Sequence, residues 1–60
     1  MYAIECYGTD PGGRRVRRFA LADTQRGAAL EVARTRRTWG ERGRRLVQSD
    51  VYETEQIARH

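Results

Sequence analysis

Apolar side chains between residues 23 and 40 recur with the period of an α-helix. At about 100° per residue, one arc of this helix collects the residues Ala28, Ala29, Val32, Ala33 and Trp39, with Leu30 at its edge. The opposite arc collects the residues Glu31, Arg34, Thr35 and Thr38. Asp23 can cap the first turn through its carboxylate, and Gly40 can end the last turn. We therefore predict an amphipathic helix over residues 23–39 with a shallow, alanine-rich apolar face.

Two segments that precede the helix alternate between apolar and polar residues, as strands do. The first is predicted at residues 2–7, and its apolar side consists of Tyr2, Ile4 and Cys6. The second is predicted at residues 14–21. Residues 8–13 between them read GTDPGG, and a proline followed by glycines is typical of a tight turn. The two strands are therefore expected to form a hairpin.

The second strand has an ambiguous pattern, because apolar residues lie on both of its faces. Val16 and Ala20 lie on one face, and Phe19 and Leu21 lie on the other. If Phe19 and Leu21 face the helix, the arginines at positions 15 and 17 share that face. In that arrangement the open face of the sheet carries Arg14 and Arg18.

A third strand is predicted at residues 45–53, after a glycine-containing connection at residues 40–43. Residues 54–60 form a short polar tail. The order strand, strand, helix, strand predicts an α+β fold of the ββαβ type, in which one helix packs on one face of a three-stranded sheet.

The length of 60 residues allows one small domain, and such a domain buries little apolar surface. One cysteine cannot form an intramolecular disulfide, and one histidine with it is too few for a zinc site of Cys and His. A homodimer or higher homo-oligomer is therefore a reasonable expectation. The sequence contains no apolar run long enough to span a membrane and no signal-peptide pattern, so we expect a cytoplasmic protein.

Catalysis is not indicated by the sequence. Cys6 has no histidine partner other than His60, and Asp50, Glu53 and Glu55 are more typical of a solvated strand edge than of a carboxylate site. The paired glycines lie in the predicted hairpin turn rather than between a strand and a helix, where a phosphate loop would place them. We expect no enzyme activity, no cofactor and no metal ion.

Charge is the most prominent feature of the composition. All twelve basic residues are arginine, which is typical of a high-GC genome as well as of guanidinium chemistry. Residues 14–45 hold eleven of them against three acidic residues, whereas both ends of the chain are net acidic. Guanidinium groups bind phosphate in a bidentate manner and displace counterions from nucleic acid.

Nucleic-acid binding is the function that this charge distribution favours. The candidate phosphate contacts are Arg14, Arg15, Arg17, Arg18, Arg36, Arg37, Arg44 and Arg45, with Tyr7 as the aromatic side chain that could stack on a base. The alternative is a protein-binding module or inhibitor, encoded by a phage in one version of this hypothesis, that docks on an acidic partner protein. The sequence does not separate these two functions.

Part of the chain resembles the ribbon-helix-helix repressors. The resemblance covers the strand that begins at Arg15, the capped helix, and residues 49–59 as a second helix. It implies a dimer whose paired strands enter the major groove, with Arg15, Arg17 and Arg18 at the groove-facing positions. The sequence departs from that family in having an extra strand and hairpin before the ribbon.

The whole chain also resembles small uncharacterised proteins of high-GC bacteria and their phages with a strand, turn, strand, helix, strand order. This similarity rests on element order and arginine usage and has no defining motif. It implies the ββαβ fold and an accessory or regulatory role.

Overall fold

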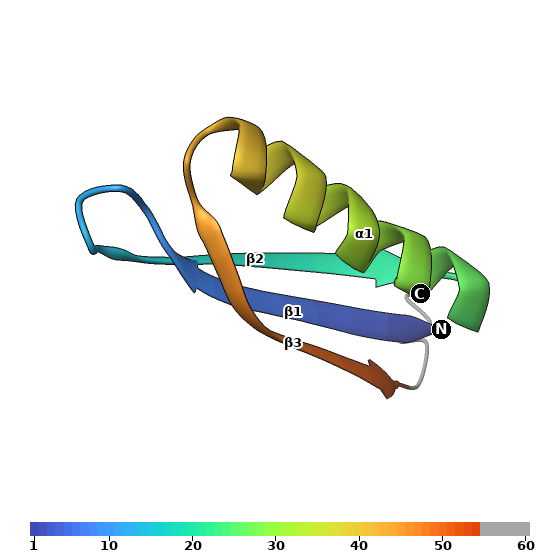
Figure 1. Ribbon diagram of the computed structural model, residues 1–60. Coiled ribbons are helices and arrows are strands. Elements are labelled where there is room, and N and C mark those ends of the chain that lie inside the picture. Colours follow the sequence, from blue (N-terminus) through green and yellow to red (C-terminus); the bar gives the residue numbers. More distant parts are fainter. Residues whose placement is uncertain (55–60) are drawn as a thin grey trace.

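The computed structural model describes residues 1–54 of the chain. Its elements are β1 (Tyr2–Thr9), β2 (Arg15–Ala22), α1 (Gln25–Glu41) and β3 (Arg45–Glu53). The strands form an antiparallel sheet in the order β2-β1-β3, and α1 lies across one face of it (Figure 1). The predicted ββαβ fold is therefore confirmed. The polar tail predicted at residues 54–60 lies outside the described residues, except for Thr54.

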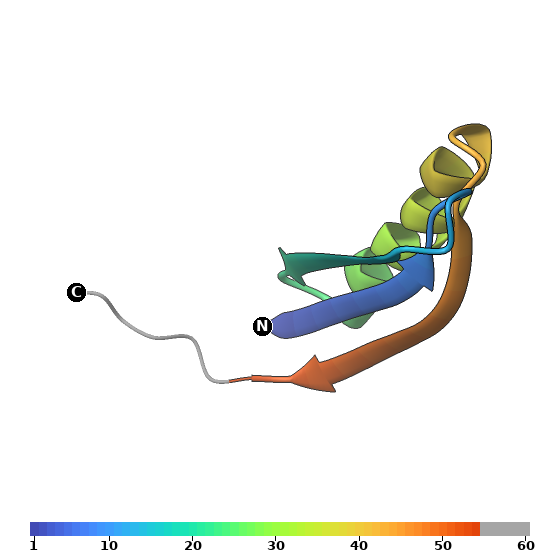
Figure 2. The ribbon, with the colours of Figure 1, turned by 90° about the vertical axis from the view of Figure 1, so that its left-hand side faces the viewer.

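The ribbon-helix-helix alternative requires a second helix from residue 49 onward. Residues 49–53 are instead part of β3, which pairs with β1 along its length. β3 curves around the end of α1, and the helix lies entirely on the inner side of the bent sheet (Figure 2). Residues 1–54 therefore form one helix on a three-stranded sheet, which contradicts a ribbon-helix-helix arrangement for residues 49–53. Residues 55–59 of the second helix in that arrangement lie outside the described residues.

The hairpin between β1 and β2 has the predicted turn chemistry. The Asp10 carboxylate accepts hydrogen bonds from the backbone N–H groups of Gly12 and Arg14, both at 2.9 Å. The N–H of Gly13 donates to the Asp10 carbonyl, and Gly13 has a φ of 83°, which glycine adopts without the steric cost of a side chain.

The ends of α1 differ from the prediction. Thr24, not Asp23, is the N-cap, and its Oγ1 accepts a hydrogen bond from the N–H of Gly27 at 2.9 Å. Gly40 lies within the last turn, because the helix continues to Glu41. The left-handed residue that follows the helix is Gly43, with a φ of 75°. Both ends are thus displaced toward the C-terminus, because the cap and the turn use the next suitable residue.

The buried face of α1 is also rotated from the predicted arc. Its buried residues are Ala28, Thr35 and Trp39, whereas Ala29, Leu30 and Ala33 are exposed. Thr35 can be buried because its hydroxyl donates to the Glu31 carbonyl at 2.8 Å and accepts from a side chain of the sheet. The predicted arc is therefore wrong because a polar residue, Thr35, lies in the middle of the buried stripe.

The core is small and centred on β1. Its buried apolar residues are Ile4, Cys6, Ala28 and Trp39, and the flanking half-buried residues are Tyr2, Val16, Ala20, Ala22, Val32 and Leu46. The ring of Trp39 lies over Gly8, where a Cβ atom would be 3.0 Å from the Trp39 Cζ3 atom and 2.0 Å from the Arg45 carbonyl oxygen. No helix among residues 1–54 is long and apolar enough to cross a membrane.

Candidate nucleic-acid-binding face

The sheet has one face that α1 does not cover, and we call it the open face. Directly paired residues of antiparallel strands point to the same side of a sheet. The strand register therefore assigns to the open face Ala3, Glu5, Tyr7 and Thr9 of β1, Arg15, Arg17, Phe19 and Leu21 of β2, and Arg45, Gln48, Asp50 and Tyr52 of β3.

This assignment corrects the orientation considered for the second strand. Phe19 and Leu21 lie on the open face, whereas Val16 and Ala20 pack beneath the helix. The small side chains of Ala20 and Ala22 allow close approach of α1, which bulkier side chains at these positions would prevent. Arg15 and Arg17 consequently lie on the open face and Arg18 on the helix side.

Arg18 is engaged within the fold by two residues of α1. Its Nη2 lies 3.0 Å from Glu31 Oε1, and its Nη1 donates to Thr35 Oγ1 at 2.8 Å. The placement of Arg18 on the open face is therefore wrong, because two helix residues bind its guanidinium. The Arg18 side chain belongs to the helix side of the sheet and not to the open face.

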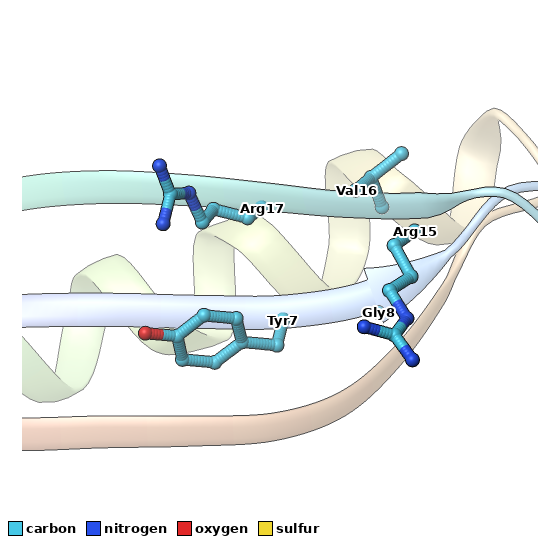
Figure 3. A pocket seen from close by; sticks show the side chains of 5 residues that line it. All are labelled: Tyr7, Gly8, Arg15, Val16 and Arg17. Carbon is cyan, nitrogen blue, oxygen red and sulfur yellow. The ribbon is translucent and has the colours of Figure 1, made fainter.

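The hairpin end of the open face is basic. A hollow of about 460 Å³ is lined by Tyr7, Gly8, Arg15, Val16 and Arg17. The ring of Tyr7 lies along the sheet surface, with Arg17 on the neighbouring strand and the Arg15 side chain extending across β1 (Figure 3). Within residues 1–54, neither Arg15 nor Arg17 forms an ion pair with an acidic side chain.

Glu5 fixes two tyrosines on the same face. Its Oε1 accepts a hydrogen bond from the Tyr7 hydroxyl, and its Oε2 accepts one from the Tyr52 hydroxyl at 2.8 Å. These bonds hold the pKa of the Glu5 carboxyl below its usual value, the bond from Tyr7 having the largest effect. The same bonds raise the pKa of Tyr7 and of Tyr52, because they favour the protonated phenol beside a carboxylate.

The far end of the open face is apolar. Phe19 is 59 % exposed, Leu21 52 % and Tyr52 45 %. Ala3 lies between Leu21 and Tyr52 in the register and is itself buried by these neighbours. The open face thus changes from basic at the hairpin to apolar at the opposite end, with Glu5 and Asp50 between the two regions.

The remaining predicted arginines are distributed over other surfaces. Arg45 pairs with Thr9 and joins the basic end of the open face, and Arg14 is exposed in the hairpin turn. Arg36 and Arg37 are exposed on α1, on the other side of the sheet. Arg44 is half-buried, and its backbone N–H donates to the Trp39 carbonyl at 2.8 Å. The structure therefore brings together Tyr7, Arg15, Arg17 and Arg45 but not the whole predicted set.

Two residues of this face were missed by the sequence reasoning. Glu5 was not singled out in the sequence, although its spacing from Tyr7 is that of residues on one side of a strand. The face of Phe19 was left open, and only its placement on the helix side was followed through. Its exposure could not be inferred, because the partners that hold Arg18 beneath the helix come from a distant segment.

Among residues 1–54, no three side chains of His, Cys, Asp or Glu are grouped so that they could hold a metal ion. Cys6 is a buried free thiol. No protein-family model matches the chain. No curated protein and no solved structure matches it either. Function is therefore inferred from the residues of the open face.

Proposed function

We propose that this protein binds nucleic acid through the basic end of the open face, in an accessory or regulatory role. One observation carries the proposal: the Tyr7 ring and the guanidinium groups of Arg15 and Arg17 lie together at one exposed hollow. Among residues 1–54, no acidic side chain forms an ion pair with either arginine. Aromatic rings stack on bases, and guanidinium groups bind the phosphates between them.

The arrangement favours a strand whose bases are accessible. Tyr7 and Phe19 are on adjacent strands and on the same face, so successive bases could stack on the two rings. A second hollow, of about 300 Å³, is lined by Glu5, Tyr7, Arg17, Arg18 and Phe19. The Glu5 carboxylate in this hollow can accept hydrogen bonds from the exocyclic amines of bases. Single-stranded RNA or DNA is therefore the preferred ligand class in this proposal.

The proposal is tested by removing charge from two surfaces in matched amounts. The binding of a labelled single-stranded oligonucleotide is followed by fluorescence anisotropy over a range of salt concentrations. The double variant Arg15→Ala/Arg17→Ala should bind more weakly, and the slope of log K against log salt should fall by about 1.4, since each lost contact to a single strand accounts for about 0.7. The control Arg36→Ala/Arg37→Ala removes the same charge from α1 and should retain most of the slope.

Equal losses in the two double variants would contradict a site on the open face. Polyglutamate serves as a second probe, because it offers negative charge without bases. If wild-type protein binds polyglutamate as tightly as the oligonucleotide, then charge alone explains binding and the stacking role of Tyr7 is refuted.

An acidic protein partner is the second candidate function. The exposed apolar side chains of Phe19, Leu21 and Tyr52 favour it, because contiguous exposed apolar side chains are typical of protein interfaces. The apolar groups of such a partner would pack against Phe19, Leu21 and Tyr52. Its carboxylates would form ion pairs with Arg15 and Arg17. A complete lack of oligonucleotide binding at low salt would make this candidate the stronger one.

A further inference from the structure

β3 forms one border of the sheet, and its outer edge offers backbone groups for pairing (Figure 1). The N–H of Thr54 donates to the Met1 carbonyl at 2.9 Å, and the register places these two residues directly opposite each other. Hydrogen-bonded and non-hydrogen-bonded pairs alternate along antiparallel strands. The backbone groups of Tyr52, Asp50 and Gln48 therefore point toward β1. Those of Ser49, Val51 and Glu53 point outward.

This edge lacks two of the features that prevent strands from associating, and its charged residues are Arg45, Asp50 and Glu53. It contains no proline and no lysine, and its irregularity is confined to the bulge near Val47, opposite Tyr7 and Gly8. Val47 is 66 % exposed and Val51 is 43 % exposed. Two β-branched side chains are therefore exposed along an edge whose outward backbone groups have no partner among residues 1–54.

The sequence of this edge is complementary to itself in the antiparallel direction. With a two-fold axis at Ser49, Val47 lies opposite Val51 of a second copy, and Gln48 lies opposite Asp50. Gln48 already donates from Nε2 to an Asp50 carboxylate oxygen at 3.1 Å within one chain, so the same bond can form across the axis. The outward-pointing residue Ser49 meets its own copy as a hydrogen-bonded pair.

We propose that two copies of this chain pair through β3 and form a continuous six-stranded antiparallel sheet. The β3 edge supports this pairing independently of the proposed nucleic-acid function. The other border of the sheet, β2, is less suited to self-pairing because each copy would bring its three arginines to the same interface. An axis at Val51 instead of Ser49 would bring Glu53 opposite Ser49 and would pair valine only once.

The dimer would place both open faces on the same side. From β1 of one copy to β1 of the other there are three strand spacings, or about 14 Å. The Ser49 axis offsets the two Tyr7 residues by two residues along the strands, so they would lie about 16 Å apart. The two basic ends would thus flank one extended surface, with their hairpins pointing in opposite directions.

The mass of the protein in solution tests the pairing without any nucleic acid. Light scattering after size exclusion should give twice the 7.0 kDa of one chain at high concentration. Val47→Lys places a charge opposite Val51 of the second copy and should raise the dimer dissociation constant at least tenfold. Leu30→Lys adds the same charge at a 62 % exposed position on α1 and should leave the dimer unchanged. Circular dichroism of both variants confirms that they fold.

The register is tested by disulfide formation in a Cys6→Ala background, which removes a thiol that faces Ser49 within the chain. Ser49→Cys should crosslink two chains on oxidation, because its Cα atoms would lie about 5.5 Å apart across the axis. Gln48→Cys, the adjacent position, should not crosslink. A monomeric wild type at millimolar concentration, a dimer that persists in Val47→Lys, growth into filaments, or equal crosslinking of both cysteines would overturn the proposal.

Discussion

Gly8 is the residue at which this small fold has no room for a side chain. The ring of Trp39 and the carbonyl of Arg45 both occupy the space that a Cβ atom would need. Its backbone conformation does not require glycine, since φ at this position is not positive. The constraint is therefore one of packing between β1, the bulged start of β3 and the end of α1.

Replacing Gly8 with Ala should consequently destabilise the protein. We expect the free energy of unfolding to fall by about 2–3 kcal/mol, because Trp39 and β3 must shift to admit the methyl group. Denaturant unfolding followed by Trp39 fluorescence measures the change. Gly40→Ala is the matched control: a Cβ atom at Gly40 would meet no neighbouring atom within 4 Å, and a helical Ala should stabilise by about 0.5–1 kcal/mol. Equal effects of the two substitutions would contradict the close packing at Gly8.

Glu5 gives the open face a defined pH response. Its pKa is lowered, so its contribution to stability is complete above the unfolded value of 4.5 and is lost as pH falls through the folded pKa. The pKa values of Tyr7 and Tyr52 are raised, so their contribution is complete below 10.0 and is lost as pH rises through the folded values.

Glu5→Gln should therefore lower the pKa of tyrosine ionisation, measured by the tyrosinate absorbance band during an alkaline titration. The reason is that the amide offers no carboxylate to hold the two phenols protonated. Tyr7→Phe and Tyr52→Phe assign the shifted groups. A titration curve that Glu5→Gln leaves unchanged would show that the hydrogen bonds do not persist in solution.

At the level of elements, the start of α1 depends on Thr24. Its hydroxyl accepts the N–H of Gly27, one of the backbone donors that the first turn leaves without a partner. Thr24→Ala should lower the free energy of unfolding by about 1 kcal/mol. Asp23→Ala should change it by a few tenths at most, since Asp23 is exposed and precedes the cap. Thermal unfolding followed by circular dichroism measures the loss of stability in each variant. A larger loss in Asp23→Ala than in Thr24→Ala would show that Asp23 is the cap.

The order of the elements was predictable from the sequence because alternation, turn residues and helical period agree along most of the chain. The turn residues at positions 8–13, between two alternating segments, predicted the hairpin, and the hydrogen bonds of Asp10 confirm it. The face of β2 was not predictable. Alternation in RRVRRFAL permits either face, and the choice depends on Glu31 and Thr35, which bind Arg18 from the helix.

The candidate site was predictable only in part for the same reason. Clustered arginines and Tyr7 are visible in the sequence. However, consecutive residues of a strand point to opposite faces of the sheet, and consecutive residues of a helix point in different directions around its axis. Arg15 and Arg17 were separated from Arg18 in this way. Arg36 and Arg37 were separated from all of them because α1 lies on the other side of the sheet.

At the level of the whole molecule, the open face combines two surfaces in one small domain. The net charge of +4 favours approach to a polyanion, and in the proposed function the tyrosine and arginine side chains at the hairpin end are the place where it binds. The apolar end of the open face, with Phe19, Leu21 and Tyr52, is a separate surface on which a protein partner could dock. Pairing through β3 would place two such faces side by side and would increase the affinity for a long strand through two linked sites.

The most direct test of nucleic-acid binding at this place is NMR. A single-stranded oligonucleotide is added to isotope-labelled protein, and the shifts of the backbone amides are followed residue by residue. We expect the largest changes at Tyr7, Arg15 and Arg17 and at the neighbouring positions of β1 and β2, with little change along the exposed side of α1. Unchanged spectra at low salt, or changes confined to α1, would contradict the assignment of the open face as the binding site.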